Sequence, residues 1–320
     1  MTTSTVYTQV NRVSAAICAQ ALQTSVSDLH EAMGGTLAKA HTMSHLMRPL
    51  ITGVRIAGPA VTAHCPPADN LMELLLMVDA AHRASAGTVS VVTPYFGYAR
   101  QDRKDKPRVP IAAKLVANLI SFAKADRIMA WDFHAGQIQG FFDIPVDHLD
   151  SHAVFIPYIE NLRLENLTFA APDVGATNRI REIASYFEAE MVICDKHRKR
   201  ANEIASMVVI GEVADRDIVL IDDICDTAGT LSKAAKLLKD KGARSVRALC
   251  THPVLSGNAY VNIENSVMEE LVVCDTIPLR GQSSKLKVLS VANLFASAIK
   301  NAYENQSITS LFIHSQLRNK

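Results

Sequence analysis

The segment Ile218-Val-Leu-Ile-Asp222-Asp223-Ile-Cys-Asp226-Thr227-Ala228-Gly229-Thr230 joins an apolar run to two carboxylates, a short turn and the start of a helix. The apolar run predicts a buried strand, because the strands of a parallel sheet are covered on both faces. The helix predicted over Leu231–Lys241 carries apolar residues at helical spacing on one face and stops at Gly242. This order of strand, turn and helix is the repeating unit of an α/β fold.

The same alternation of strand and helix patterns extends upstream to about residue 70. Two cycles of this kind predict two α/β domains with mostly parallel sheets, joined near residues 146–160. The predicted elements before the quoted segment are a helix from Leu71 to Val78, a strand over Thr88–Thr93, a helix over Ile111–Ala125, strands over Arg127–Trp131 and Thr168–Ala171, a helix over Thr177–Phe187 and a strand over Met191–Cys194.

The composition is that of a globular protein with balanced charge. The 320 residues are 48% hydrophobic, and 33 Lys and Arg nearly equal 32 Asp and Glu, so nothing indicates a nucleic acid or membrane partner. The six cysteines form no Cys-x-x-Cys pair and no cluster with metal-ligand spacing, which favours a reducing compartment. Neither a signal-peptide pattern nor an apolar run of membrane-spanning length is present, so we expect a cytoplasmic protein.

The turn after Ile221 has the chemistry of a sugar-phosphate site. Backbone N–H groups of the turn and of the helix N-terminus can bind an anion, and the hydroxyls of Thr227 and Thr230 add donors. Gly229 allows the backbone to approach a phosphate closely. Because carboxylates repel phosphate, Asp222 and Asp223 are expected to contact sugar hydroxyls or a metal. The structural alternative is an ordinary βα turn with a threonine cap.

A basic run, Lys196-His-Arg198-Lys-Arg200, follows the predicted strand Met191–Cys194. Five consecutive basic or potentially basic residues are difficult to bury, so an exposed loop is predicted. Its functional interpretation is a mobile cationic arm that closes over phosphates and stabilises charge on a transferred group. The alternatives are a solvated charge run and a nuclear-localisation-like patch.

Three further polar loops follow predicted strands, where α/β sheets bind their ligands. Arg100-Gln-Asp-Arg-Lys-Asp-Lys-Pro-Arg108 is a candidate for nucleotide contacts, with a salt-bridged surface loop as the alternative. His134 lies beside an acid and two amides, although a lone histidine is more often structural. Asp173, in Pro-Asp-Val-Gly175, suits a hard cation such as Mg²⁺, which prefers one or two carboxylates together with phosphate oxygens and water.

Residues 70–312 closely resemble the ribose-phosphate pyrophosphokinase (phosphoribosyl pyrophosphate synthetase) family. The motifs that carry the resemblance are Tyr98-Ala-Arg-Gln-Asp102, Asp132-x-His-Ala-x-Gln-Ile-Gln-Gly-Phe-Phe-Asp-Ile-Pro-Val-Asp147, Asp222-Asp-x-x-Asp-Thr-Ala-Gly-Thr230, Thr251-His-Pro-Val-Leu-Ser-Gly257 and Ser307-Ile-Thr-Ser-Leu-Phe312. The resemblance implies two domains like those of type I phosphoribosyltransferases, over 1–149 and 150–306, with 307–320 returning to the first. It also implies a homo-oligomer, with a dimer as the building block and a hexamer as the larger assembly.

The implied reaction transfers the pyrophosphoryl group of Mg-ATP to the 1-hydroxyl of ribose 5-phosphate, giving phosphoribosyl pyrophosphate and AMP. The matched catalytic residues are Lys196 and Arg198, and the matched Mg²⁺ positions are His134 and Asp173. The residues assigned to ATP are Arg100, Gln101, Asp102, Lys104, Asp105 and His134. The residues assigned to ribose 5-phosphate are Arg198, Asp222, Asp223, Asp226, Thr227, Ala228, Gly229 and Thr230. Phosphate or ADP is the implied effector, with matching contacts at Ser85, Arg108, Gln139 and Ser307.

Residues 1–69 depart from the family pattern, because the Phe-Ser-Asp-Gly-Glu element that helps to hold adenine is missing. Residues 25–70 instead resemble the start of the RNase-E-inhibitor/class II oxo-acid aldolase-like family, without that family's catalytic region. This departure leaves open a catalytically impaired or regulatory subunit that co-assembles with active synthetases. A phosphoribosyltransferase is a third interpretation, supported by Asp222–Thr230 alone.

Overall fold

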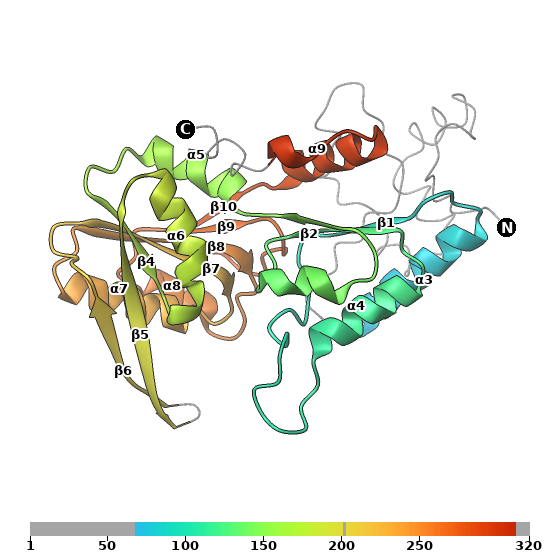
Figure 1. Ribbon diagram of the computed structural model, residues 1–320. Helices are drawn as coiled ribbons and strands as arrows, with labels where there is room; N and C mark the ends of the chain where they lie inside the picture. The colour runs from blue at the N-terminus through green and yellow to red at the C-terminus, as the bar shows by residue number, and fades with distance from the viewer. Residues whose placement is uncertain (1–67, 201–202, 312–320) are drawn as a thin grey trace. The chain divides into compact units, whose positions relative to one another are not determined.

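Two sheets organise this computed structural model, which describes residues 68–200 and 203–311 (Figure 1). Only the backbone is described at Ala68, Asp69, Lys196–Arg200 and Glu203–Ser206. The chain divides into two compact units, Met1–Leu149 (unit 1) and Asp150–Lys320 (unit 2). Among the described residues, none of the helices has the length and hydropathy that a membrane crossing requires.

Unit 1 contains a parallel three-stranded sheet in the order β1-β2-β3, formed by β1 (Ser90–Thr93), β2 (Arg127–Trp131) and β3 (Val146–Leu149). Helices α3 (Ala68–Arg83) and α4 (Ala112–Phe122) contribute to the same hydrophobic cluster as β1 and β2. The cluster includes Val78, Val91, Ala117, Ile120, Ile128 and Ala130. Burial of apolar side chains at helical spacing on α4 therefore fixes this helix over the sheet.

Unit 2 contains a seven-stranded sheet in the order β10-β9-β8-β7-β4-β5-β6. Every pair is parallel except β5 with β6, so the predicted mostly parallel α/β fold is confirmed. The strands are β4 (Leu167–Ala171), β5 (Glu190–Arg200), β6 (Glu203–Ile210), β7 (Asp217–Cys225), β8 (Ser245–Pro253), β9 (Leu271–Cys274) and β10 (Leu286–Leu289). The helices are α5 (His152–Leu162), α6 (Thr177–Tyr186), α7 (Gly229–Asp240), α8 (Ala259–Glu264) and α9 (Ala292–Tyr303).

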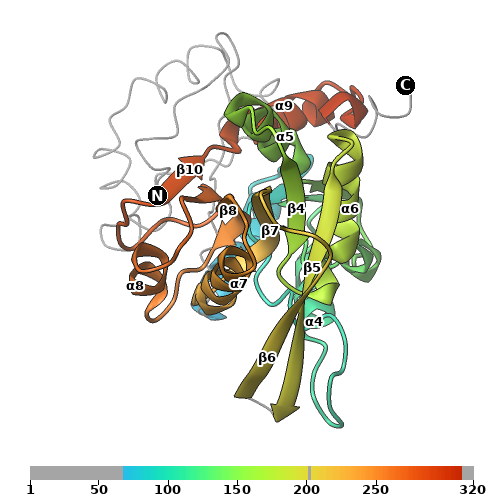
Figure 2. The same cartoon turned by 90° about the vertical axis from the view of Figure 1, so that its left-hand side faces the viewer.

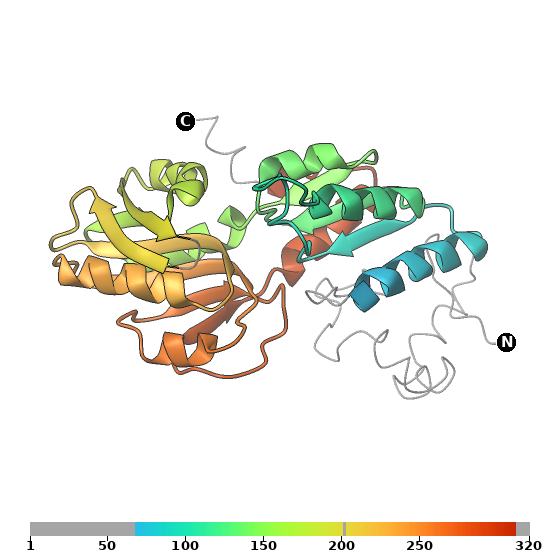
Figure 3. The same cartoon turned by 90° about the horizontal axis from the view of Figure 1, so that it is seen from below.

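Side chains on alternate sides of the central strands form the two covered faces of this sheet. Ile218 and Leu220 of β7 share a cluster with the buried face of α7, whereas the Phe169 ring of β4 packs at a tilt against Phe187 at the end of α6, with ring centroids 5.6 Å apart. Helices α7 and α8 lie on one face and α6 lies on the other (Figures 2 and 3). The two-residue period of a strand thus divides its apolar residues between two helix layers.

The basic run after Cys194 was predicted to be an exposed loop, and this prediction is wrong. Strand β5 continues to Arg200 and pairs in antiparallel fashion with β6 (Figure 2). This pairing places the backbone of Lys196 opposite Met207. An antiparallel ladder satisfies backbone N–H and C=O groups whatever the side chains are, so a charged segment can remain a strand. The apolar residues of β6 supply the partner strand that the basic run alone does not indicate.

A polar network ties β7 to β8 at the start of both strands, where Asp217 and Ser245 are paired in register. The Asp217 carboxylate is almost fully buried and accepts hydrogen bonds from the Arg244 guanidinium and, at 2.6 Å, from Ser245 Oγ. These donors, Arg244 first, lower the pKa of Asp217 below its ordinary value, against the opposing effect of burial. The network stabilises the charged carboxylate at the end of the sheet away from the β7–α7 turn.

Candidate active site

The turn between β7 and α7 contains a left-handed residue at a helix N-terminus. Ala228 is the N-cap of α7 and adopts the left-handed conformation, with φ 57° and ψ 2°. Gly229 begins the helix, and a Cβ atom added there would meet only Thr227 Oγ1, at 3.5 Å. The first N–H groups of a helix have no acceptor within the helix, so they are directed out of its N-terminus as anion donors. Phosphate binding at this turn stays a prediction, and the left-handed residue of the turn is Ala228.

Three carboxyl groups lie at the adjoining carboxyl ends of β4 and β7. Asp173 follows β4, whereas Asp222 and Asp223 belong to the last part of β7, which is the neighbour of β4. Burial, followed by the neighbouring carboxylates Asp223 and Asp173, raises the pKa of Asp222 well above its ordinary value. This mutual repulsion makes the cluster a natural acceptor of hydroxyl donors or of a cation.

The three carboxyl groups are held differently by the local backbone. Asp223 N–H donates to Asp222 Oδ1 at 3.0 Å, and Ala176 N–H donates to Asp173 Oδ1 at 3.3 Å. Asp223 is only 8% exposed, whereas Asp222 and Asp173 are half-buried. Asp222 and Asp173 are therefore the more accessible members of the cluster.

Lys196 and Arg198 lie on β5 beyond its parallel pairing with β4, which ends at Ile193. Their backbone pairs with Met207 and Ile204 of β6, and a register shift interrupts the ladder between His197 and Arg198. Their side chains lie outside the described atoms. The catalytic roles assigned to these residues from the sequence stay predictions.

The residues predicted to bind ATP belong to unit 1, in the loops that follow β1 and β2. These loops are joined by a 2.7 Å hydrogen bond from Gln137 Nε2 to Asp102 Oδ2. Arg100, Gln101, Lys104, Asp105 and His134 are exposed on the same two loops. The structure therefore brings the two predicted ATP loops together, because the carboxyl ends of neighbouring parallel strands share one sheet edge.

An aromatic cluster forms the base of these loops. Phe96, after β1, packs edge-on against Phe133, after β2, with ring centroids 5.5 Å apart, and against Phe142 at 5.6 Å. His148 of β3 stacks on Phe133 at 4.8 Å and accepts the Phe133 N–H at Nε2, at 2.9 Å. Edge-to-face packing stabilises such pairs beyond simple burial, so the cluster fixes the backbone from which His134 projects.

The carboxylate oxygens near the β7–α7 turn suit a divalent cation that takes its remaining ligands from substrate and water. No three or more His, Cys, Asp or Glu side chains are grouped as a complete cation cage in the part of the chain that the structure describes. The carboxylates of Asp173 and Asp222 nevertheless offer the hard oxygen ligands that such a cation prefers, to be completed by phosphate oxygens and water. His134 belongs to unit 1 and Asp173 to unit 2, so their joint assignment to a metal stays a prediction.

Sequence reasoning assigned no role to two residues that contact the β7–α7 turn. Asn262 of α8 donates from Nδ2 to the Thr227 carbonyl at 2.9 Å, and Ser256 Oγ donates to Asp226 Oδ1. Ser256 belongs to the motif Thr251–Gly257, and the recurrence of this motif in the resembled family could have indicated a role for Ser256. Asn262 carried no signal, because its partner is 35 residues away.

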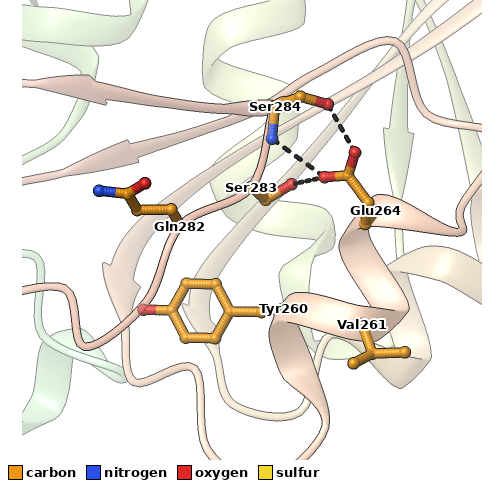
Figure 4. A pocket seen from close by; sticks show the side chains of 6 residues that line it. All are labelled: Tyr260, Val261, Glu264, Gln282, Ser283 and Ser284. Atoms are coloured by element: carbon orange, nitrogen blue, oxygen red, sulfur yellow. Dashed lines mark hydrogen bonds between the residues drawn. The ribbon is translucent and has the colours of Figure 1, made fainter.

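A shallow concavity beside α8 is lined by Tyr260, Val261, Glu264, Gln282, Ser283 and Ser284 (Figure 4). The Glu264 carboxylate accepts hydrogen bonds from both serine hydroxyls, at 2.6 and 2.7 Å, and from the Ser284 N–H at 3.0 Å. These donors lower the pKa of Glu264. Because the Glu264 carboxylate is occupied by hydrogen bonds from Ser283 and Ser284, these contacts anchor α8.

Together these features define an α/β protein with a left-handed turn at a helix N-terminus and a carboxylate cluster at one edge of a mostly parallel sheet. Residues 60–123 match the N-terminal domain of ribose phosphate pyrophosphokinase, and residues 183–313 match the phosphoribosyl synthetase-associated domain. The chain belongs to the ribose-phosphate pyrophosphokinase family.

Individual relatives agree with this assignment. A ribose-phosphate pyrophosphokinase of Campylobacter jejuni is 54% identical over 254 residues, covering 79% of this chain and 82% of the relative. One from Wolinella succinogenes is 55% identical over 248 residues, covering 78% and 80%. The crystal structure of phosphoribosylpyrophosphate synthetase from Mycobacterium smegmatis is 37% identical, with a TM-score of 0.72, covering 76% of this chain and 80% of that one.

The comparisons also revise the interpretation of the N-terminal segment. The family match begins at residue 60, within the segment 1–69 that was considered atypical. The resemblance of residues 25–70 to the RNase-E-inhibitor/class II oxo-acid aldolase-like family gains no support. Residues 1–67 lie outside the described structure. The predicted absence of the adenine-contacting element concerns this segment, so it stays a prediction.

Proposed function

We propose that this chain transfers the pyrophosphoryl group of Mg-ATP to the 1-hydroxyl of ribose 5-phosphate, forming phosphoribosyl pyrophosphate and AMP. The observation that carries the proposal is the β7–α7 turn, which combines anion donors and carboxylates at one sheet edge in a chain of this family. Phosphate and hydroxyl groups are the two kinds of group that a sugar phosphate presents. The regulatory-subunit alternative is not favoured, because relatives sharing about half of their residues with this chain are themselves pyrophosphokinases.

The phosphate of ribose 5-phosphate binds the N–H groups of the turn Asp226–Ala228 and of the first turn of α7, with the Thr227 and Thr230 hydroxyls as further donors. Asp222 and Asp223 accept hydrogen bonds from the ribose hydroxyls. This contact relieves the repulsion that raises the pKa of Asp222, so sugar binding favours the charged carboxylate. The site thus distinguishes a sugar phosphate from phosphate alone.

The 1-hydroxyl oxygen attacks the β-phosphorus of ATP and forms a new P–O bond while the bond to the α-phosphate oxygen breaks. AMP leaves with that oxygen, and the hydroxyl proton passes to solvent. No covalent enzyme intermediate is needed, so catalysis consists of positioning and charge stabilisation. Lys196 and Arg198 supply positive charge to the transferred phosphates, and the loops of Arg100–Asp105 and His134 hold ATP.

Mg²⁺ bound to the ATP phosphates would neutralise charge that develops during transfer. Asp173 and His134 are its proposed protein contacts. Phosphate or ADP as effectors, a dimer-based homo-oligomer and a cytoplasmic location are further predictions from the resemblance.

The test measures AMP released from ATP by the purified full chain with ribose 5-phosphate, Mg²⁺ and phosphate. Lys196→Ala is expected to lower the rate by about 10²- to 10³-fold, the usual effect of losing one transition-state charge contact. Lys241→Ala is the matched control, since Lys241 is exposed just after the far end of α7. Absence of AMP from the unmodified chain under these conditions would refute the proposed activity.

A further inference from the structure

The β7–α7 turn is held from outside by a single later segment of the chain. Leu255 N–H donates to the Cys225 carbonyl at 3.0 Å and Ser256 N–H to the Asp226 carbonyl at 2.9 Å. Ser256 Oγ donates to the Asp226 carboxylate, and Asn262 Nδ2 donates to the Thr227 carbonyl at 2.9 Å. Cys225 at the end of β7 and the first two residues of the turn, Asp226 and Thr227, therefore all accept hydrogen bonds from residues 255–262.

The turn needs this support because Ala228 is left-handed. A residue with a Cβ atom is less stable in this conformation than in its ordinary helical form, because the Cβ lies too close to the following carbonyl oxygen, and glycine avoids that cost. Turning over the Thr227–Ala228 peptide would release Ala228 from this conformation. Contacts that oppose such a rotation are therefore required to maintain the observed turn.

Asn262 acts on the group that would have to move. A peptide unit is planar and trans, so its C=O and N–H point in opposite directions. Holding the Thr227 carbonyl toward α8 directs the Ala228 N–H away from α8 and keeps it available as an anion donor. Loss of the Asn262 amide would remove the hydrogen bond that selects this orientation.

Asn262 is itself firmly placed, because α8 is anchored on both sides. Ser232 Oγ of α7 donates to the Asn262 carbonyl at 3.2 Å. On the opposite side, Tyr260 Oη accepts the Arg280 N–H at 3.0 Å, and Glu264 accepts the donors of Ser283 and Ser284 (Figure 4). A short helix fixed in this way can hold a side chain against a strained turn.

We propose that Asn262 and Ser256 are positioning residues, which hold the Asp226–Ala228 turn in the shape that binds the phosphate of ribose 5-phosphate. This inference rests on the proposed function, because it deepens the role of the same site. It predicts that the two residues affect affinity for the sugar phosphate without contacting it.

The experiment compares Asn262→Ala with Asn161→Ala in the full chain. Asn161 is a matched control: it is also a helical asparagine that donates to a backbone carbonyl, that of Pro157 at 2.8 Å, but on α5. Direct binding of ribose 5-phosphate is measured by calorimetry without ATP. Asn262→Ala should weaken binding and raise the KM for ribose 5-phosphate by about 3- to 10-fold, the effect of one lost hydrogen bond. The KM for ATP, the kcat and the melting temperature should stay close to those of the Asn161→Ala control.

A rescue variant separates positioning from a general structural role. Ala228→Gly relieves the left-handed strain, so Asn262→Ala should lose less affinity in the Ala228→Gly background than in the native one. Ser256→Ala should likewise raise the KM for ribose 5-phosphate alone.

Equal affinity of Asn262→Ala and the native chain for ribose 5-phosphate would overturn the positioning role, while AMP release by the native chain would leave the proposed function standing. The positioning role would also be overturned if Asn262→Ala lost as much affinity for ribose 5-phosphate in the Ala228→Gly background as in the native one. A rise in the KM for ATP that parallels the rise in the KM for ribose 5-phosphate would overturn it as well. Failure of the native chain to bind ribose 5-phosphate would overturn both proposals.

Discussion

Replacing Asp222 by asparagine should stabilise the protein at neutral pH while impairing sugar-phosphate binding. Burial and the neighbouring carboxylates of Asp223 and Asp173 both disfavour the charged form of Asp222, so they raise its pKa. The asparagine side chain would keep the oxygen that accepts the Asp223 N–H, and its amide could donate to the Asp223 carboxylate. A repulsive pair would thereby become a hydrogen-bonded one.

The size of the effect follows from typical values for relieving strain at a functional site. A stabilisation of about 0.5–2 kcal/mol is usual for one such change, and about 2–4 °C of melting temperature corresponds to each kcal/mol in a unit of this size. A rise of roughly 1–8 °C is therefore expected at pH 7.5. The kcat/KM for ribose 5-phosphate should fall by about 10- to 150-fold, since a hydrogen bond to a charged group contributes about 1.5–3 kcal/mol.

The pH dependence provides the sharper test. A carboxyl whose folded-state pKa is raised binds its proton more readily in the folded state, so the folded protein loses stability as pH rises from about 3.9, the unfolded value, through the folded pKa. Above the folded pKa the cost is complete. The advantage of Asp222→Asn should grow as the pH rises above about 3.9, be present at neutral pH, and disappear below about pH 4.

The assay is chemical unfolding in urea across this pH range, with Asp240→Asn as the matched control. Asp240 is an exposed carboxylate at the end of α7, paired with Lys236, so its replacement should change stability by less than about 1 kcal/mol. A variant at Asp222 that is no more stable than the native chain at pH 7.5 would refute the reasoning. A gain that does not vary with pH would refute it as well.

Three further changes probe the core, the strand network and the ATP loops. Leu238→Ala leaves a cavity at a fully buried position of α7 and should lower the unfolding free energy by about 2–5 kcal/mol. The KM for ATP should be unchanged when it is measured at a low temperature at which the variant is still folded. Asp217→Asn weakens the contacts from Arg244 and Ser245 and should cost about 1–3 kcal/mol at pH 7. Because those contacts lower the pKa of Asp217, urea unfolding should show the difference shrinking as pH falls below about 4. His134→Ala should raise the KM for ATP about 10-fold or more with calorimetric affinity for ribose 5-phosphate unchanged, and equal changes in both would contradict its assignment.

Local patterns predicted much of the architecture because they report local preferences. Strand β2 has the predicted bounds Arg127–Trp131, and α6 begins at the predicted Thr177. The predicted buried face of α7 is confirmed, with Leu231, Ala234, Ala235 and Leu238 all covered. In each case the periodicity of apolar residues contains the information, since it reflects which side of an element faces the core.

The β5–β6 hairpin shows where such reasoning fails. Five consecutive basic or potentially basic residues have loop-like polarity, yet the backbone of Lys196–Arg200 continues β5 because β6 pairs with it. Pairing of strands is a property of two segments, and no single segment reveals it. The predicted catalytic residues therefore belong to a paired ribbon instead of a loop.

The sequence by itself determined the α/β class, the order of the main elements and the chemistry of the turn after β7, because these depend on neighbouring residues. Only the tertiary structure placed Asp173 beside Asp222, made Ala228 the left-handed residue of that turn, and brought Asn262 to the Thr227 carbonyl. Each of these depends on contacts between segments distant along the chain. Burial, carboxylate repulsion and backbone strain arise when folding brings those segments together, so no local pattern of residues encodes them.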